Sequence, residues 1–152
     1  MPTNLLRSRN GRVSGAPQGA AGRSEGPPRR IRIRARDIEL VAELAATATA
    51  DRLLAALPLY GVAEPWGETL HFEVPLASGR ERNARVNASL GDICFWPSEQ
   101  RIIIPFGPTP ISRAGECRMP EPVNVVARVI GDVGSLRMVR VGERVALGRL
   151  DD

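Results

Sequence analysis

Apolar and polar side chains alternate strictly over residues 31–36, which read IRIRAR. A period of two places Ile31 and Ile33 on one face of a half-buried strand and the arginines on the other face. Beyond Asp37 the apolar side chains move to the even positions 38, 40, 42 and 44. We therefore expect a tight turn or a bulge at Arg36 and Asp37, so that the chain opens with a β-hairpin.

A short helix is predicted over residues 50–57. Thr47 or Thr49 can accept hydrogen bonds from the unpaired amides at its start. Asp51 suits the positive end of the helix, and Pro58 ends it. Because so short a helix needs tertiary packing to persist, we expect its leucines to face the core and the helix to cover an open end of a sheet.

Short extended segments make up most of the remaining chain. The predicted strands are residues 69–74, the hairpin arms 93–96 and 101–106, a buried strand at 123–130, and a last strand at 144–150. We expect a polar loop through residues 80–85 and an irregular segment over residues 107–122. Many short strands, one short helix and no βαβ spacing favour a barrel or a sandwich over an open parallel sheet.

Charge separates the first residues from the rest of the chain. Residues 1–30 hold six arginines and one glutamate, whereas the other fifteen arginines are balanced by sixteen acids. Residues 1–29 are rich in Arg, Gly and Pro and are predicted to be a disordered tail, and residues 30–152 are predicted to form the single domain. The tail is either an arm that weakly tethers RNA or binds an anionic surface, or an extension without a role, and we expect no other nucleic-acid partner.

The types of chemistry-bearing residue exclude several functions. Every basic side chain is arginine, so Schiff-base chemistry and a Walker-type phosphate loop are excluded. His71 is the single histidine, which leaves no His-based metal cluster, and we expect neither a metal nor a cofactor. Cys94 and Cys117 form no Cys-x-x-Cys pair, which favours the reduced thiols of a cytoplasmic protein. No apolar run reaches the roughly 18 residues of a membrane helix, so no membrane partner is expected.

Four motifs occur in one order along the chain, namely residues 65–72 (PWGETLHF), 91–97 (GDICFWP), 106–110 (FGPTP) and 122–125 (PVNV). Together they resemble a small prokaryotic family of uncharacterised cyclophilin-like proteins, from about residue 31 to residue 150. The resemblance implies a mostly β fold, a closed cyclophilin-like eight-stranded barrel with one or two short helices that cap its ends. It implies no established activity.

The prolyl isomerases of this fold present a catalytic arginine, aromatic residues and a histidine around a surface groove. No run of this sequence matches theirs closely enough to carry those residues across, although Arg101 and Phe106 share a predicted strand. A shared fold does not establish a shared function. Peptidyl-prolyl isomerisation with non-standard residues is therefore the alternative function, and no catalytic residue is assigned.

Aromatic residues lie next to turns at the ends of the predicted strands. Trp66 and Trp96 each stand where a strand meets a turn, and an indole there can stack on a ligand ring or a proline, or can cap the core. The predicted ligand-binding residues are Trp66, Glu68, Trp96, Arg101, Phe106, Thr109 and Asn124. They lead to the interpretation of the domain as a noncatalytic module that binds a small molecule or an extended peptide.

Structural roles remain open for several of these residues. Arg101 can meet a ligand carboxylate or cover a strand edge, and Asn124 can bind a ligand or satisfy the backbone of a loop. Thr109 lies in a proline-rich stretch that suits a shaped rim or a plain corner. His71 and Glu73 point to the same face of a strand, which allows either an acid–base pair or a solvated surface.

Overall fold

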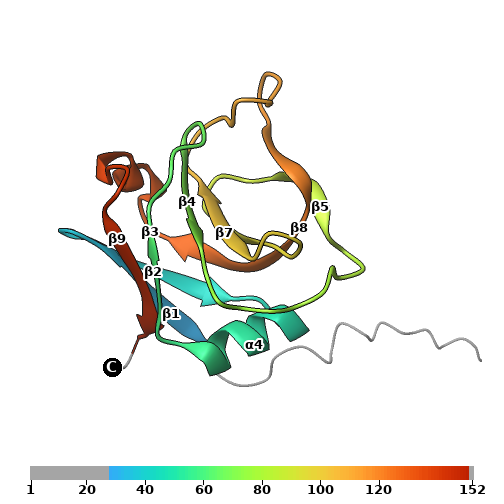
Figure 1. Ribbon diagram of the computed structural model, residues 1–152, viewed down its shortest axis with the longest axis vertical. Helices are drawn as coiled ribbons and strands as arrows, with labels where there is room; N and C mark the ends of the chain where they lie inside the picture. Colours follow the sequence, from blue (N-terminus) through green and yellow to red (C-terminus); the bar gives the residue numbers. More distant parts are fainter. Residues whose placement is uncertain (1–27, 151–152) are drawn as a thin grey trace, which may run out of the picture.

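The computed structural model describes residues 28–150 (Figure 1). The strands in chain order are β1 (Arg30–Ala35), β2 (Ile38–Leu44), β3 (Leu59–Val62), β4 (Thr69–Glu73), β5 (Arg85–Ala88), β6 (Asp92–Trp96), β7 (Arg101–Pro105), β8 (Cys117–Ile130) and β9 (Arg144–Arg149). The helices are α4 (Ala48–Ala56) and the 3-10 helix η1 (Val133–Met138). The predicted tail lies outside the described residues, apart from Pro28 and Arg29.

The strands form an antiparallel sheet in the order β3-β9-β1-β2-β8-β6-β7-β4, and β5 pairs with β8 off this path. The mostly β class is confirmed. The predicted closed barrel is wrong, because the sheet is not closed. β3 and β4 are the two end strands of the sheet. Within residues 28–150 they are bridged by one isolated pair, Glu64, which follows β3, and His71 of β4. Figure 1 shows these two strands side by side.

The residues around β3 explain why the two edges touch without pairing. Pro58 and Pro65 lie on either side of β3 and have no amide hydrogen, so neither can donate to β4. The amide of Ala63 donates to the carbonyl of Glu143, 2.8 Å away, near the start of β9. Gly61 lets the strands approach closely, because a Cβ atom added there would lie 2.6 Å from Cδ2 of Phe72.

Period-two burial in the opening hairpin is confirmed. Ile31 and Ile33 are fully buried, while the arginines between them point outward. The chain reverses at Arg36, whose φ of 54° is the left-handed conformation of a tight turn. The inner face of the sheet therefore carries the main core, whose largest members from the middle and later strands include Phe72, Phe95, Ile102, Ile104 and Leu147.

The predicted helix exists and begins two residues earlier than expected. Thr47 is its N-cap, and its side-chain oxygen accepts a hydrogen bond from the amide of Ala50. Leu53 is fully buried in the main core. Figure 1 shows α4 lying across one end of the curved sheet. No helix within residues 28–150 is long and apolar enough to cross a membrane.

Two segments expected to be irregular contain strands. The last residue of the predicted polar loop, Arg85, is the first residue of β5. The last six residues of the predicted irregular segment, 117–122, belong to β8, which begins at Cys117. These strands pair with each other, with Ala88 opposite Cys117. Their charged and proline-containing sequences gave no clear alternation, so the pairing arises from the contact between them rather than from either segment alone.

Gly61→Ala is expected to destabilise the protein by about 1–3 kcal/mol, because the new methyl group must displace Phe72 or separate β3 from β4. Urea unfolding followed by circular dichroism measures the change. Gly79→Ala is the matched control, since nothing lies within 4 Å of a Cβ atom added there. Equal stability of the two variants would contradict a tight β3–β4 contact.

Candidate functional site

Strand register gathers chemically distinct side chains on the outer face of β4, β7, β6 and β8. His71 lies opposite Ile103, Ile103 opposite Cys94, and Cys94 opposite Val125. Directly paired residues project from the same face of a sheet, so these four side chains form one row across four strands. The next row consists of Glu73, Arg101 and Trp96.

This outer face carries its own apolar cluster, distinct from the main core. Cys94, Ile103, Met119 and Val123 are its buried members, and each is at most 1% exposed. Trp66 and Trp96 are only partly buried and pack against it. The predicted gathering of the two tryptophans at one surface therefore has a physical basis, because both cover the same apolar strip.

The turn that carries Trp66 is fixed by its neighbours. The hydroxyl of Thr69 donates to the carbonyl of Trp66 at 2.7 Å, and the amide of Glu68 donates to the carbonyl of Pro108 at 3.0 Å. Gly67 has a φ of +60°, and a Cβ atom added there would lie 2.6 Å from Cδ of Pro110. A glycine is thus required for the left-handed turn and for the close approach of the two loops.

His71 lies beside the Trp66 indole, with ring centroids 6.4 Å apart in an edge-on arrangement. Both of its ring nitrogens are covered, and neither has a hydrogen-bond partner among residues 28–150. Burial lowers the pKa of the imidazole, and the charge of Arg101 lowers it further, against a smaller opposing effect of Glu64. The ring is therefore neutral at pH 7, with one nitrogen able to donate and one able to accept.

Arg101 is oriented by Glu64, whose carboxylate accepts a hydrogen bond from the guanidinium at 2.8 Å. Glu64 is also the residue that bridges to His71, since its amide donates to the His71 carbonyl at 2.8 Å. The acid–base pair of His71 and Glu73, one of the two alternatives left open by the sequence, is not formed, because no described residue hydrogen-bonds to the imidazole. No local pattern in the sequence singles out Glu64, because its position depends on the contact between β3 and β4.

Trp96 is held at the other end of the row. Its indole Nε1 donates to Glu121 at 2.9 Å, and the hydroxyl of Ser98 donates to the same carboxylate oxygen. These two hydrogen bonds, the one from Trp96 first, hold the pKa of Glu121 below its usual value. The indole is thereby fixed in orientation, while its ring remains partly exposed.

Phe106 and Glu68 belong to a different cluster. The guanidinium of Arg137, from η1, lies 5.1 Å from the centroid of the Phe106 ring and 2.7 Å from the carboxylate of Glu68. Phe106 packs against the main core rather than against the apolar cluster of Cys94. Arg137 also lines a cavity of about 490 Å³ with Arg36, Asp37, Ile38, Met138 and Arg140.

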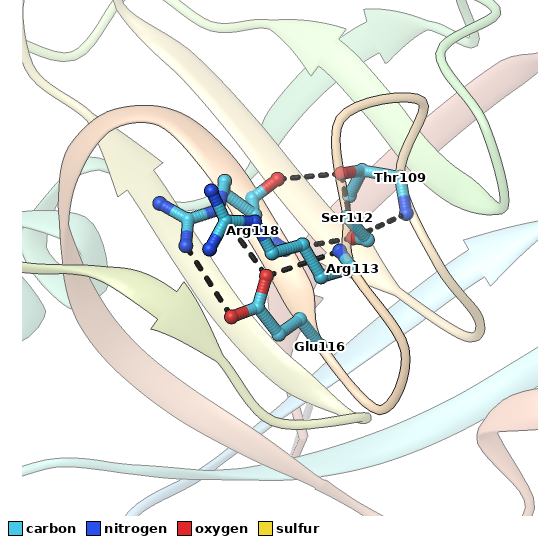
Figure 2. Close-up of polar contacts among 5 residues, drawn as sticks. All are labelled: Thr109, Ser112, Arg113, Glu116 and Arg118. Atoms are coloured by element: carbon cyan, nitrogen blue, oxygen red, sulfur yellow. Dashed lines mark hydrogen bonds and ion pairs between the residues drawn. The ribbon is translucent and has the colours of Figure 1, made fainter.

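Thr109 is occupied by bonds within its own loop (Figure 2). Its hydroxyl donates to the carbonyl of Arg118 at 2.6 Å and lies 2.9 Å from the hydroxyl of Ser112, which also accepts from the amide of Arg118. The Glu116 carboxylate accepts from the amide of Arg113 and from the guanidinium of Arg118. Thr109 is 5% exposed, so it shapes the loop from within.

Asn124 lies on the opposite side of β8, fully buried. Its amide nitrogen donates to the hydroxyl of Thr49 at 3.0 Å and to the carbonyl of Gly79 at 2.8 Å, and its oxygen accepts from the amide of Glu81 at 2.9 Å. Asn124 therefore ties the 79–81 loop and the start of α4 to the sheet. This is the structural alternative that the sequence left open.

The two thiols are poor nucleophiles. Burial is the main cause that raises the pKa of Cys94, and the charge of Asp92 raises it further. Burial also raises the pKa of Cys117. Because the thiolate is the reactive form, both side chains act in this structure as small apolar residues.

Comparisons with known proteins support the fold. A family model described as "Cyclophilin-like" matches residues 29–148. The solution structure of the hypothetical protein AF2241 from Archaeoglobus fulgidus is 33% identical, with a TM-score of 0.70 over 82% of this chain and 97% of that one. The structure of McbB in complex with tryptophan is 19% identical, with a TM-score of 0.57 over 80% of this chain and 45% of that one. No curated protein matches significantly.

His71 is expected to make stability fall as the pH drops below about 6.5, its ordinary pKa. The unfolded chain binds a proton there before the folded chain does, because the pKa of His71 is lowered on folding. Urea midpoints measured between pH 7.5 and 5.5 report this loss of stability. Glu121, the acid that is hydrogen-bonded to Trp96, has a lowered pKa and titrates below this pH range. His71→Leu should flatten the dependence, whereas an unchanged slope in that variant would contradict the assignment.

Asn124→Ala is expected to lower the free energy of unfolding by about 1–3 kcal/mol, since it removes the hydrogen bonds that join this fully buried side chain to the buried Thr49 hydroxyl and to the 79–81 loop. Chemical unfolding measures the change. Asn87→Ala, at an exposed position of β5, is the matched control. A loss no greater than that of the control would mean that Asn124 does not hold this loop.

Proposed function

The chain belongs to the cyclophilin-like family, and we propose that its domain is a noncatalytic binding module for a small molecule or a short extended peptide. The binding surface in this proposal is the tryptophan strip, defined as Trp66, His71, Trp96 and Arg101 around the cluster of Cys94 and its neighbours. The observation that carries the proposal is the second apolar cluster on the outer face, with two partly exposed indoles packed against it.

The apolar part of the strip supports the choice of ligand. Two indoles on one strip offer flat apolar surfaces to a ring or to a proline. Their positions are fixed, since Trp66 is held in a glycine turn and Trp96 is hydrogen-bonded to Glu121. A fixed aromatic surface loses little conformational entropy when a ligand binds.

The polar part of the strip supports a ligand that also carries a hydrogen-bonding group. The guanidinium of Arg101 is oriented by Glu64 and suits a carboxylate or a carbonyl oxygen. The neutral His71 has unused donor and acceptor capacity among the described residues. Since both nitrogens are covered, a ligand reaches them only when a neighbouring side chain shifts, and the indole of Trp66 lies beside them.

A noncatalytic role is favoured by the state of the nucleophiles. Cys94 belongs to the strip, but burial keeps its thiol protonated. Thr109, the hydroxyl-bearing residue among the predicted site residues, is occupied within its own loop. The remaining groups bind and orient rather than attack.

Trp96→Ala is expected to weaken binding of a strip ligand at least tenfold, because it removes one of the two stacking surfaces. The probes are L-tryptophan, chosen because the neighbour McbB has been solved with it, indole-3-acetate, and a short proline-containing peptide. Thermal shift, relative to the melting temperature of each unliganded variant, identifies a probe that binds. Isothermal titration calorimetry then gives its Kd.

Leu90→Ala is the control, since Leu90 is an exposed apolar residue that is not part of the strip. It should leave the Kd unchanged. A probe that binds wild-type protein and the Trp96→Ala variant equally well would place its site elsewhere and overturn the assignment of the strip.

A further inference from the structure

A row of arginines lines the outer face of β1, on a part of the sheet that the tryptophan strip does not use. Arg30, Arg32 and Arg34 occupy alternate positions of the strand, opposite the buried isoleucines. Alternate residues of a strand are about 7 Å apart, so the row presents charges at a regular spacing along one line. Such a row is longer than a single small anion and matches a chain of repeating negative charges.

The neighbouring strands make a groove beside this row. Arg34 lies opposite Ala146 of β9, and Ala146 lies opposite Tyr60 of β3. Arg32 lies opposite Gly148. The small side chains of β9 thus form a low floor between the arginines and Tyr60. The resulting cavity of about 340 Å³ is lined by Arg32, Arg34, Pro58, Tyr60, Ala146, Leu147, Gly148 and Arg149.

The electrostatics of this groove are one-sided. Its lining contains three arginines and no acid. The acids lie on the β2 side of β1. Glu39 forms ion pairs with Arg32 at 2.9 Å and with Arg34 at 3.5 Å, and Glu43 lies opposite Arg30. Glu39 offsets one of the two charges of Arg32 and Arg34, so with Arg149 the groove keeps a net positive charge. Residues 31–152 as a whole carry slightly more acids than arginines.

The arginines are oriented rather than loose. Arg32 donates to the carbonyl of Leu150 at 2.8 Å, and Arg149 donates to the carbonyl of Leu54 at 2.9 Å. These carbonyl acceptors fix the direction of the two guanidinium groups, and Arg32 also forms an ion pair with Glu39. The groove is thus preorganised for an anionic ligand.

Tyr60 adds an aromatic surface at the rim. It is 58% exposed, which makes it one of the large apolar side chains that the fold leaves in solvent. An exposed ring next to a positively charged groove is the arrangement with which proteins bind single-stranded nucleic acid, since bases stack on the ring while phosphates follow the positive groove.

We propose that this groove, the β1–β9–β3 groove, binds single-stranded nucleic acid. The phosphates lie along Arg32 and Arg34, with Arg30 continuing the row beyond the groove, and a base stacks on Tyr60. The contacts are made to phosphates and to the face of a base, so binding depends on salt and is tolerant of sequence. The site is independent of the tryptophan strip and does not rest on the function proposed for it.

The test is fluorescence anisotropy of a labelled oligouridylate of about ten nucleotides with the full-length chain. Tyr60→Leu should weaken binding about tenfold, because it removes the stacking surface without changing charge. Arg34→Gln should weaken binding and reduce the slope of log K against log salt by about 0.7, as expected for one lost phosphate contact. Arg113→Gln is the matched control, since it removes one charge from the exposed loop before β8. Its affinity should fall less than that of Arg34→Gln.

Several outcomes would overturn the proposal. Binding that is unaffected by Tyr60→Leu and equally reduced by Arg34→Gln and Arg113→Gln would assign the interaction to general charge, including the arginines at positions 7, 9, 12 and 23. Tighter binding of a duplex of the same length would show that the ligand is not a single strand. Displacement by equal concentrations of polyglutamate would show that the groove accepts any polyanion. Absence of binding at low salt would also overturn it.

Discussion

Burial of every second side chain on the inner face of one curved sheet is the constraint on which the rest of this structure depends. Ile31, Phe72 and Ile104 are nearly or fully inaccessible, and the residues beside them in the chain must face outward. The outer surface is therefore not independent of the core. The arginine row of β1 and the tryptophan strip are the outward halves of the same alternations that build the interior.

The unpaired edge between β3 and β4 determines the contacts of Arg101 and His71 at one end of the tryptophan strip. A closed barrel would pair the two strands along their length, whereas here they meet at the single Glu64–His71 bridge within the described residues. That bridge places the carboxylate of Glu64 against Arg101 and leaves the imidazole of His71 beside Trp66. An edge strand is less constrained than a central one, which suits a place where a side chain must move to admit a ligand.

The predicted site residues separate according to what surrounds each polar atom. Trp66, Trp96 and Arg101 lie on one outer face, and the sequence had grouped them because aromatic residues occur beside turns there. Asn124 and Thr109 have their hydrogen-bonding groups satisfied by loops, which no local pattern could reveal because the partners are distant in the chain or created by the turn itself. Phe106 lies just beyond the end of β7, and the guanidinium of Arg137 from η1 covers its ring.

The sequence by itself determined the strand class, the opening hairpin, the capped helix and the face on which each strand residue lies, because these depend on local periodicity and on capping chemistry. Only the tertiary structure decided that the sheet stays open, that β5 pairs with β8, and that Glu64 joins Arg101. It also decided that Tyr60 lies across a low floor from the β1 arginines. The physical reason is that strand order and the approach of two edges depend on contacts between distant segments, which alternation within one segment does not encode.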